Sequence, residues 1–339
     1  MERMYIITGA YGHLGFTVMK MLTEAGEKVR GLVLPTDGIS GSEEIRAEIY
    51  KGNVCDTDTL IPLFSFDKAY EIIVIHTAGI VSIASKFDRL IYEVNVKGTK
   101  NIIEMCKKFN VRRLIHVSSV HAIPEKPDNE IITEVDSFNP DEVVGLYAKT
   151  KSEATQLILD GKNDGLDAVV VHPSGILGPN DYGKGHLTQL VIDYCRGALT
   201  ASIKGGYNFV DVRDVAQGII SAADSARAGE CYILSNRFYN LYEIFEMLHN
   251  IYKRPRIKTI LPMWLAKLTA PLAELYYKIL KKPPLYTNYS LYTLSSNSNF
   301  SHEKADRELS YTTRDMNESL KDTVVFLAKT GRIDKNKIR

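Results

Sequence analysis

The sequence predicts an α/β protein built on a doubly wound parallel sheet, with a smaller, mostly helical domain in its second half. Two observations carry this prediction. Short apolar runs, which suit strands covered on both faces, alternate with helix-like stretches through the first half of the chain. The first of these runs leads directly into a glycine-rich turn and a helix, an arrangement that suits a bound pyrophosphate.

Six strands are predicted in the first half of the chain. The first is a short, continuous apolar run, and helical stretches separate the six, so the strands should be parallel and joined by crossovers. In chain order the predicted strands are Met4–Thr8, Lys28–Leu34, Glu48–Tyr50, Glu71–His76, Arg113–Val117 and Ala168–His172.

The turn after the first strand carries three glycines, Gly9, Gly12 and Gly15, in the spacing GxxGxxG, and a helix is predicted over Phe16–Ala25. Bare glycine backbone lets phosphates approach, and free N–H groups at a helix N-terminus attract them. The commonest dinucleotide fingerprint is GxGxxG. A turn that serves only the packing of helix on strand is therefore the alternative to a Rossmann-type dinucleotide site.

The composition excludes several classes of function. The chain has 339 residues, 45% of them hydrophobic, which is enough to bury a large core. A formal net charge of +1 gives no sign of nucleic-acid binding. The cysteines lack CxxC spacing, so neither a metal site nor a disulfide framework is expected. With no apparent signal peptide, we expect a cytoplasmic protein. The cysteines are Cys55, Cys106, Cys195 and Cys231.

A tyrosine and a lysine, Tyr147 and Lys151, lie four residues apart in a segment that is typical of a helix. This spacing puts both on one helix face. A phenol ordinarily titrates near pH ~10, and a neighbouring ammonium favours the phenolate, which would make the tyrosine a usable acid or base. The same spacing also occurs on ordinary solvated helix faces, so the interpretation depends on the other motifs.

Six motifs occur in a fixed order: Thr8–Gly15, His76–Gly79, Asn95–Thr99, Val117–Ser119, Tyr147–Lys151 and His172–Pro179. Together they resemble the extended short-chain dehydrogenase/reductase superfamily. The resemblance covers residues 1–214, with a weaker match at 301–311. Within the superfamily the chain looks most similar to dihydroflavonol reductases and 3β-hydroxysteroid dehydrogenases.

The resemblance implies a catalytic set of three residues. Tyr147 would be the acid or base, Lys151 would lower its pKa and bind the nicotinamide ribose, and Ser119 would hold the substrate oxygen. Ser119 could instead end a buried strand and cap a turn, and Ser118 is expected to be structural. The histidines expected to be structural are His76 and His121.

The resemblance also implies a nicotinamide dinucleotide cofactor. Asn53 replaces the aspartate that is usual in the adenine-binding stretch, so adenine recognition would depend on the Asn53 amide and the Val54 backbone. Asn95 could equally be a structural amide, and His172, where many members have arginine, is expected to pack rather than act as a base. Besides Tyr147 and Lys151, the expected cofactor contacts are Gly9, Tyr11, Gly12, His13, Leu14, Gly15, Asn53, Val54, Thr77, Ala78, Gly79, Asn95, Val117, His172, Pro173, Ser174 and Ile176.

The end of the second strand leaves the choice between NAD and NADP open. An acid for NAD or an arginine for NADP is usual there, but Val33 and Leu34 occupy the place. Because no carboxylate stands there to repel a 2′-phosphate, NADP is favoured over NAD. The candidate phosphate donors are Arg30, His13, Thr36 and Ser40.

The second half should hold the substrate. No arginine occurs from Ile257 to Ala305, whereas leucine, tryptophan and tyrosine are frequent there, among them Trp264, Leu268, Tyr289 and Tyr292. A pocket lined by such residues would be apolar with phenolic hydroxyls. We assign residues 1–177 and 205–235 to the dinucleotide-binding domain and 178–204 and 236–339 to the substrate domain. The stretch Gly205–Ala216 resembles the superfamily's return into the sheet.

These features favour an oxidoreductase that interconverts a ketone and a secondary alcohol on a small hydrophobic molecule. A nucleotide-sugar epimerase or dehydratase with tightly held NAD is the alternative, but such enzymes typically hold the diphosphate with arginine forks. A non-catalytic nucleotide sensor is a third reading.

Two further features concern partners. Leu261–Leu280 is apolar and could lie on a bilayer surface, but Pro262 and Pro271 interrupt it, so a substrate lid is favoured over a membrane contact. The resemblance also implies a homodimer, formed through the predicted helices Ile91–Phe109 and Tyr147–Asp160.

Overall fold

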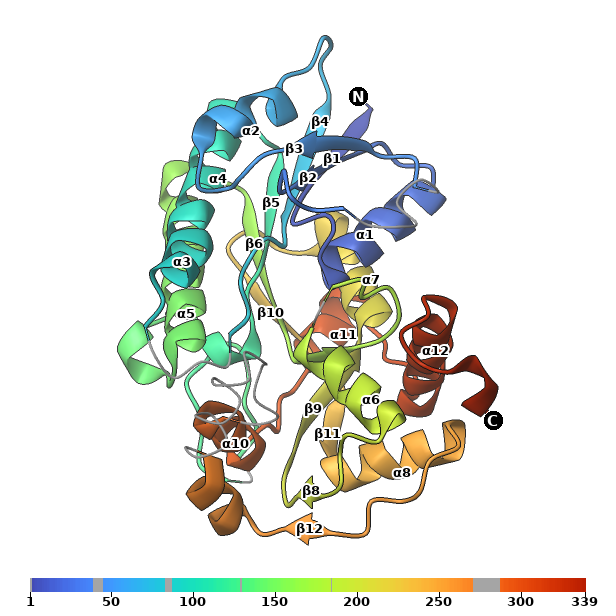
Figure 1. The fold of residues 1–339 in the computed structure, drawn as a ribbon. Coiled ribbons are helices and arrows are strands. Elements are labelled where there is room, and N and C mark those ends of the chain that lie inside the picture. Colours follow the sequence, from blue (N-terminus) through green and yellow to red (C-terminus); the bar gives the residue numbers. More distant parts are fainter. Residues whose placement is uncertain (1, 39–44, 83–86, 129, 184, 271–286) are drawn as a thin grey trace.

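Figure 1 shows the computed structural model of the protein, in which the described residues are 2–38, 45–82, 87–128, 130–183, 185–270 and 287–339. The elements of the first half are β1 (Arg3–Thr8), α1 (His13–Glu24), β2 (Val29–Val33), β3 (Glu48–Lys51), α2 (Thr57–Phe64), β4 (Glu71–His76), α3 (Arg89–Tyr92), α4 (Gly98–Lys108), β5 (Arg113–Val117), α5 (Leu146–Asp160) and β6 (Ala168–Pro173). Those of the second half are β7 (Gly175–Leu177), α6 (His186–Arg196), β8 (Ser202–Ile203), β9 (Gly206–Asp211), α7 (Val212–Ser225), β10 (Cys231–Leu234), β11 (Arg237–Asn240), α8 (Leu241–Ile251), β12 (Ile260–Leu261), α10 (Asn288–Ser295), α11 (Glu303–Leu309) and α12 (Met316–Lys329).

Seven strands form the main sheet in the order β10-β6-β5-β4-β1-β2-β3. Every neighbouring pair is parallel. The six strands predicted from the sequence are all present, with ends within one residue of those predicted. All of them except the mostly exposed edge strand β3 are largely buried. The strand order reverses between β1 and β4, so the loops after these strands border the crevice in which doubly wound sheets bind ligands.

Helices cover both faces of this sheet, as a doubly wound fold requires (Figure 1). α1 and α7 lie on one face and pack against each other, with Phe16 and Ile219 in the core beneath them. α2, α4 and α5 lie on the other face, where Leu63, Ile102 and Ile158 are buried. Helix α1 begins at His13, three residues earlier than predicted from the sequence, because it starts directly after Gly12.

The expected return of Gly205–Ala216 into the main sheet is wrong for its strand. β9 pairs with β7 in parallel and with β11 in antiparallel, and the three form a separate sheet. The helix that follows, α7, does return to the main sheet. The strand that completes the main sheet is β10, which the sequence analysis did not predict.

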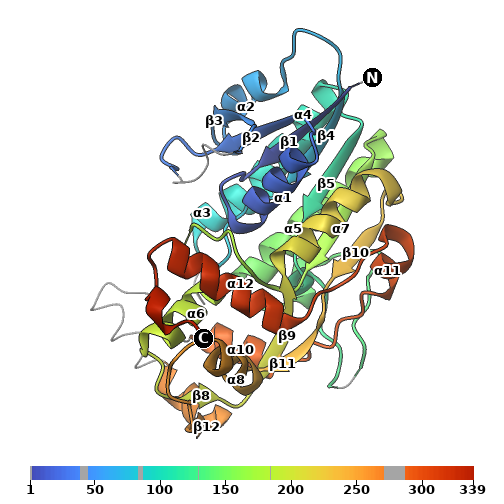
Figure 2. The same cartoon turned by 90° about the vertical axis from the view of Figure 1, so that its right-hand side faces the viewer.

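The remaining elements gather at the carboxyl end of the main sheet, in the lower half of Figure 2. There α6 and α8 pack together and α12 packs on α8. α11 lies apart from this group, against α7 and β10. The division of the chain into two domains stays a prediction.

Residues 263–270 are also helical. Trp264 and Leu268 are 67% and 68% exposed, so they do not line a pocket within the part of the chain that is described. The rest of the predicted lid, 271–280, lies outside the described residues. Across the described residues, no helix has both the length and the apolar character needed to span a bilayer.

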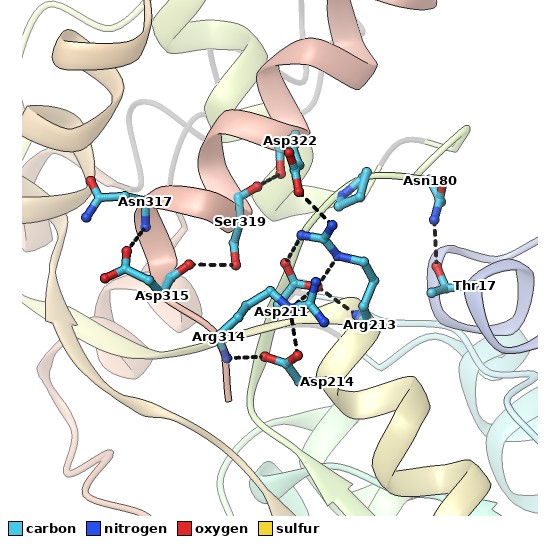
Figure 3. Close-up of polar contacts among 12 residues, drawn as sticks. Thr17, Asn180, Asp211, Arg213, Asp214, Arg314, Asp315, Asn317, Ser319 and Asp322 are labelled. Atoms are coloured by element: carbon cyan, nitrogen blue, oxygen red, sulfur yellow. Dashed lines mark hydrogen bonds and ion pairs between the residues drawn. The ribbon is translucent and has the colours of Figure 1, made fainter. Parts of the chain in front are cut away.

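An ion-pair network joins α12 to the start of α7 (Figure 3). Asp211, only 1% exposed, accepts hydrogen bonds from Arg213 Nε at 2.9 Å and Nη2 at 2.8 Å. Arg213 Nη1 also contacts Asp322 of α12 at 2.6 Å. Arg314 binds Asp214 through its backbone N–H at 2.8 Å and its Nε at 2.7 Å. Both guanidinium groups are thereby committed to carboxylates of this network.

Candidate active site

The turn after β1 is shaped by glycines. Gly9 has φ of +67°, and a Cβ there would lie 2.9 Å from the backbone N and Cα of Ala78. At Gly15, a Cβ would collide with the carbonyl oxygen of Gly9 and come within 2.7 Å of Thr77 Oγ1. The absence of side chains therefore lets three backbone segments meet: the turn, the start of α1 and the loop after β4.

The N-terminus of α1 is open to a ligand. Gly12 is its N-cap residue and no side chain caps it, so backbone N–H groups of the first turn remain available together with the helix dipole. Thr77 Oγ1 donates to the Thr8 carbonyl at 2.6 Å, which fixes the loop after β4 against the end of β1. Bare backbone beside free N–H groups is the chemistry that a dinucleotide pyrophosphate requires, so this cradle fits the predicted cofactor.

The loops after β4 and β5 meet Lys151, which the sequence predicts to be catalytic. Lys151 is 6% exposed, and its Nζ donates to the carbonyl of Val117, the last residue of β5, at 2.8 Å. A Cβ at Gly79 would lie 3.3 Å from the same Nζ. The structure thus brings Gly79, Val117 and Lys151 together, as a site for the nicotinamide ribose would need.

Tyr147 and Ser119 are the other two predicted catalytic residues, and they lie beside each other. Tyr147 occupies the first turn of α5 and is 8% exposed; Ser119 is 6% exposed and follows β5. Burial raises the pKa of Tyr147 to about 12, and a hydrogen bond with Ser119 opposes this rise. Burial lowers the pKa of Lys151 to about 8. The expectation that Lys151 holds the phenol's pKa down is therefore wrong for this structure, in which burial dominates both groups.

Ser118 and Asn95 are structural in the arrangement seen here. Ser118 Oγ is 2.6 Å from Thr155 Oγ1 of α5. Asn95, 1% exposed, lies in a π-helical turn (Glu93–Lys97) between α3 and α4. Its Nδ2 donates to the Ile80 carbonyl and to Thr150 Oγ1, both at 3.1 Å. Its contacts tie α5 to the loop after β4, and its role as a cofactor contact stays a prediction.

The histidine at the end of β4, His76, is fully buried and has two hydroxyl partners. Its Nδ1 is 2.7 Å from Thr8 Oγ1 and its Nε2 is 3.1 Å from Thr99 Oγ1. Burial lowers its pKa to about 3, so the ring is neutral. The structural role predicted for His76 agrees with these contacts.

Several predicted cofactor contacts have protein partners. The Asn53 side chain accepts from the Cys55 N–H at 3.0 Å. The Val54 carbonyl accepts from Asn101 Nδ2 at 2.8 Å. Ser174 Oγ donates to Asn208 Oδ1 at 2.9 Å. These bonds orient Asn53, Val54 and Ser174, and their contacts with adenine or nicotinamide stay predictions, as do those of Tyr11, Leu14, Pro173 and Ile176.

Contacts at the end of β2 weaken the basis for favouring NADP over NAD. Asp37 Oδ2 accepts from the backbone N–H of Leu34 at 3.2 Å, so a carboxylate folds back to the end of the strand. Arg30, proposed as a phosphate donor, is bound instead to Glu48 through Nε at 2.8 Å. It also donates Nη1 to the Ser65 carbonyl at 2.7 Å.

A second proposed donor is also engaged. His13 Nε2 is 2.9 Å from the Pro179 carbonyl, and burial lowers the pKa of His13. Ser40 lies outside the described residues. The electrostatic reason for preferring NADP therefore does not carry over to the folded chain.

A pocket of about 120 Å³ borders the turn that follows Ser119. His121 lines it, with its ring 6.0 Å from that of Tyr147 and its Nε2 3.0 Å from the Tyr207 hydroxyl. Of the described residues that line it, none is lysine or arginine. The lining residues are Val120, His121, Ile123, Glu125, Ile132, Glu142, Val143, Val144, Tyr207, Tyr292, Ser296, Asn297 and Phe300.

Sequence reasoning missed that aromatic groups from three distant segments lie around Tyr147. His121 stacks on Tyr207 with ring centroids 5.6 Å apart and lies 6.2 Å from Tyr289. The Tyr289 ring packs over Gly145, whose φ of +98° and missing side chain make room for it. The signal was present in the tyrosines of the second half, but their partners could be found only from the fold.

Comparison with known proteins identifies the family. The model of the NAD dependent epimerase/dehydratase family matches residues 5–240. Sterol demethylase protein B of Methylococcus capsulatus is 26% identical, over 97% of this chain and 99% of that protein. 3β-Hydroxysteroid dehydrogenase type 7 of Mus musculus is 28% identical, over 91% of this chain and 90% of that protein.

Among solved structures, the crystal structure of gox2253 superposes with a TM-score of 0.84 and 28% identity, covering 98% of this chain and all of that chain. The match therefore includes the second half of the protein as well as the dinucleotide-binding half. The glycine cradle, the convergence of Ser119, Tyr147 and Lys151, and the family match over most of the chain lead to one assignment. The chain belongs to the NAD-dependent epimerase/dehydratase family of the extended short-chain dehydrogenase/reductase superfamily, as its motifs predicted.

Proposed function

We propose that this enzyme interconverts a ketone and a secondary alcohol on a neutral, hydrophobic small molecule, with a nicotinamide cofactor. The observation that carries the proposal is the pocket near Tyr147, which is lined mainly by aliphatic and aromatic side chains. It also has polar groups of His121, Ser296 and Asn297 and two carboxylates, but, among described residues, no lysine or arginine. A sugar nucleotide brings a diphosphate, which such a pocket would repel. The names of the sterol and steroid relatives point the same way.

The protein's part in the reaction is to manage the substrate oxygen and its proton. In the reductive direction, negative charge grows on the carbonyl oxygen, and the hydroxyls of Ser119 and Tyr147 stabilise it with hydrogen bonds. Tyr147, with its pKa raised to about 12 by burial, is protonated at neutral pH and can deliver the proton. Lys151 holds the Val117 carbonyl and orients the cofactor side of the site. When bound, the nicotinamide supplies or accepts the hydride.

The stoichiometry of cofactor use distinguishes the proposed function from the epimerase alternative. A dehydrogenase consumes or releases one free reduced cofactor per turnover, whereas an epimerase returns its hydride and gives no net absorbance change. We would assay a 3β-hydroxysteroid, a dihydroflavonol and UDP-glucose with each cofactor. Cofactor-neutral turnover of UDP-glucose would overturn the proposal.

The catalytic assignment is tested in the same assay. Tyr147→Phe removes only the phenolic hydroxyl and should lower kcat by a factor of about 10² to 10⁴, with the dissociation constant for the dinucleotide nearly unchanged. Tyr92→Phe is the matched control, because its hydroxyl donates to Glu153 and neither residue lines the pocket. Equal kcat values for Tyr147→Phe and the wild type would contradict the assignment.

The cofactor preference is proposed in revised form. From the sequence we expected NADP, but the carboxylate of Asp37 beside the end of β2 and the engagement of Arg30 remove the main reasons. We therefore expect NAD(H) to be used at least as well as NADP(H).

A further inference from the structure

His172 lies directly behind the proposed oxyanion-binding serine. It is the penultimate residue of β6 and is fully buried. Its Nδ1 is 2.9 Å from the carbonyl oxygen of Ser119. Because a carbonyl oxygen only accepts hydrogen bonds, Nδ1 must carry the proton, and the neutral ring is the Nδ1–H tautomer.

The imidazole is itself fixed in place relative to the catalytic helix. Its ring stacks on Phe138, with centroids 5.2 Å apart and an interplanar angle of 11°. The backbone N–H of Phe138 donates to Oε1 of Gln156 in α5 at 2.8 Å. Through this series of contacts, His172 links the backbone of Ser119 to α5, the helix that carries Tyr147.

The stability of the fold does not explain why an imidazole stands here. The Nε2 atom of His172 is buried and has no hydrogen-bond partner among the described residues. A buried acceptor without a partner costs free energy. A phenylalanine would fill much of the same space, keep the stack on Phe138 and avoid that cost. The feature that only the imidazole provides is the hydrogen bond to Ser119.

Without His172, the carbonyl of Ser119 would be held only from within its own short turn, among the described residues. In that 3₁₀ turn the Ser119 carbonyl accepts a 3.0 Å bond from the N–H of Ala122, and the Ser119 Oγ accepts a 3.2 Å bond from the N–H of His121. His172 adds a second donor to the same carbonyl from a different element, β6. A small rotation of the Ser119 peptide plane would move the hydroxyl away from Tyr147.

We propose that His172 is a positioning residue: by holding the Ser119 carbonyl, it keeps the Ser119 hydroxyl directed at Tyr147 and at the substrate oxygen. The inference rests on the function proposed for Ser119. It differs from the sequence-based expectations for His172, which were packing and contact with the cofactor.

Two substitutions separate positioning from packing. His172→Phe keeps the ring and removes the donor, whereas His172→Asn loses the ring but can present an amide N–H near the position of Nδ1. We expect His172→Phe to lower kcat by about 10-fold to 100-fold with an unchanged dissociation constant for the dinucleotide. His172→Asn should retain kcat within about threefold despite a lower Tm. If activity instead follows Tm across the two variants, His172 is only a packing residue.

A double-mutant cycle distinguishes failure of this inference from failure of the proposed function. With pregnenolone as the 3β-hydroxysteroid probe, Ser119→Ala should lower kcat, and adding His172→Phe should have little further effect, since both act through one hydroxyl. Full activity in Ser119→Ala would overturn the proposed function itself. Reduced activity in Ser119→Ala with wild-type activity in His172→Phe would overturn only the positioning role.

A second measurement needs no turnover of pregnenolone. In protein labelled with ¹³Cζ-tyrosine, the Tyr147 resonance is assigned from Tyr147→Phe, and its shift reports the hydrogen bond to Ser119. His172→Phe should move this resonance in the same direction as Ser119→Ala, and His172→Asn should leave it near the wild-type position. An unmoved resonance in His172→Phe would overturn the inference.

Discussion

At the scale of single residues, burial sets the protonation of the catalytic pair. Tyr147 and Lys151 are both more than nine-tenths buried, and burial moves the pKa of the phenol up and that of the ammonium down. Each shift disfavours the charged form. At neutral pH the tyrosine is therefore an uncharged acid. The lysine is still charged, because its pKa lies only a little above neutral pH.

The first prediction concerns the effect of Lys151 on stability. Its pKa is about 8 in the folded protein against 10.5 for the free side chain, so between these values the unfolded chain binds a proton that the folded chain does not. Stability from this group therefore rises with pH across that window. Relative to Lys151→Met, the wild type should gain up to about 1.4 kcal/mol per pH unit, measured by urea unfolding.

The contradicting result would be parallel pH dependence of wild type and Lys151→Met between about pH 8 and about pH 10. Tyr147 does not interfere with this comparison. Because its pKa is raised in the folded protein, it reduces the free energy of unfolding only above the ordinary phenol value of 10.0.

The second prediction concerns Asp37 and the choice of cofactor. If its carboxylate, held on the Leu34 N–H, lies near the 2′ position of the adenosine ribose, it repels a 2′-phosphate. Asp37→Ala should then raise kcat/KM for NADPH relative to NADH by at least about fivefold. Asp164→Asn, an exposed carboxylate paired with Lys107, is the control and should leave the ratio unchanged. An unaltered ratio in Asp37→Ala would remove Asp37 from the site.

These details show which properties of single residues can be inferred from the sequence and which cannot. Ser119, Tyr147 and Lys151 could be proposed from the sequence because their motifs are local and ordered, and their catalytic roles stay predictions. The sign of the Tyr147 pKa shift could not, because spacing along a helix does not report burial depth. Asp37 was overlooked because it stands beyond the strand and reaches the β2 end only by folding back.

At the scale of elements, strands were predicted well and their partners less well. A strand covered on both faces is a continuous apolar run, which can be recognised from the sequence alone. The same pattern does not say which sheet a strand joins, and β9 was therefore assigned to the wrong one. Pairing is decided by contacts between segments far apart in the sequence.

The third prediction compares two glycines of the α1 turn. Gly12 has φ of −73°, and a Cβ there would meet only the Gly9 carbonyl oxygen, at 3.2 Å. Gly12→Ala should thus fold with nearly the wild-type Tm but lose affinity for NADH, because the methyl group blocks the phosphates. Gly15→Ala, which collides with backbone, should lose Tm as well. Calorimetric titration and thermal unfolding together provide the test, and full NADH affinity in Gly12→Ala would refute the phosphate-loop assignment.

At the scale of the whole molecule, the network in Figure 3 fastens the C-terminal helix α12 to the junction of β9 and α7. Asp211 is the centre of this network: burial opposes its ionisation, but hydrogen bonds from Arg213 outweigh burial and lower its pKa. The carboxylate is therefore charged, and it is paired well away from solvent.

The fourth prediction contrasts the two carboxylates that bind Arg213. Asp211→Asn removes a buried carboxylate, leaves the partly buried Arg213 guanidinium with Asp322 alone, and should reduce the free energy of unfolding by about 3 kcal/mol. Asp322→Asn removes a carboxylate that is 44% exposed and should cost less than about 1 kcal/mol. Urea unfolding of both variants provides the comparison. Equal losses would mean that burial of Asp211 contributes nothing.

The chain passes between the two larger sheets three times within the described residues, and two of these passages are short. Ser174 alone separates β6 from β7 and two residues separate β10 from β11, whereas α7 lies between β9 and β10. Two short links fixed at different points resist bending and twisting of one sheet against the other more than a single hinge would. The part of the fold around Ser119 and Tyr147 should therefore move as one rigid body. New substrate preferences would then arise from changes in the segments attached to it, such as α10 with Tyr289, without altering the geometry of Ser119 and Tyr147.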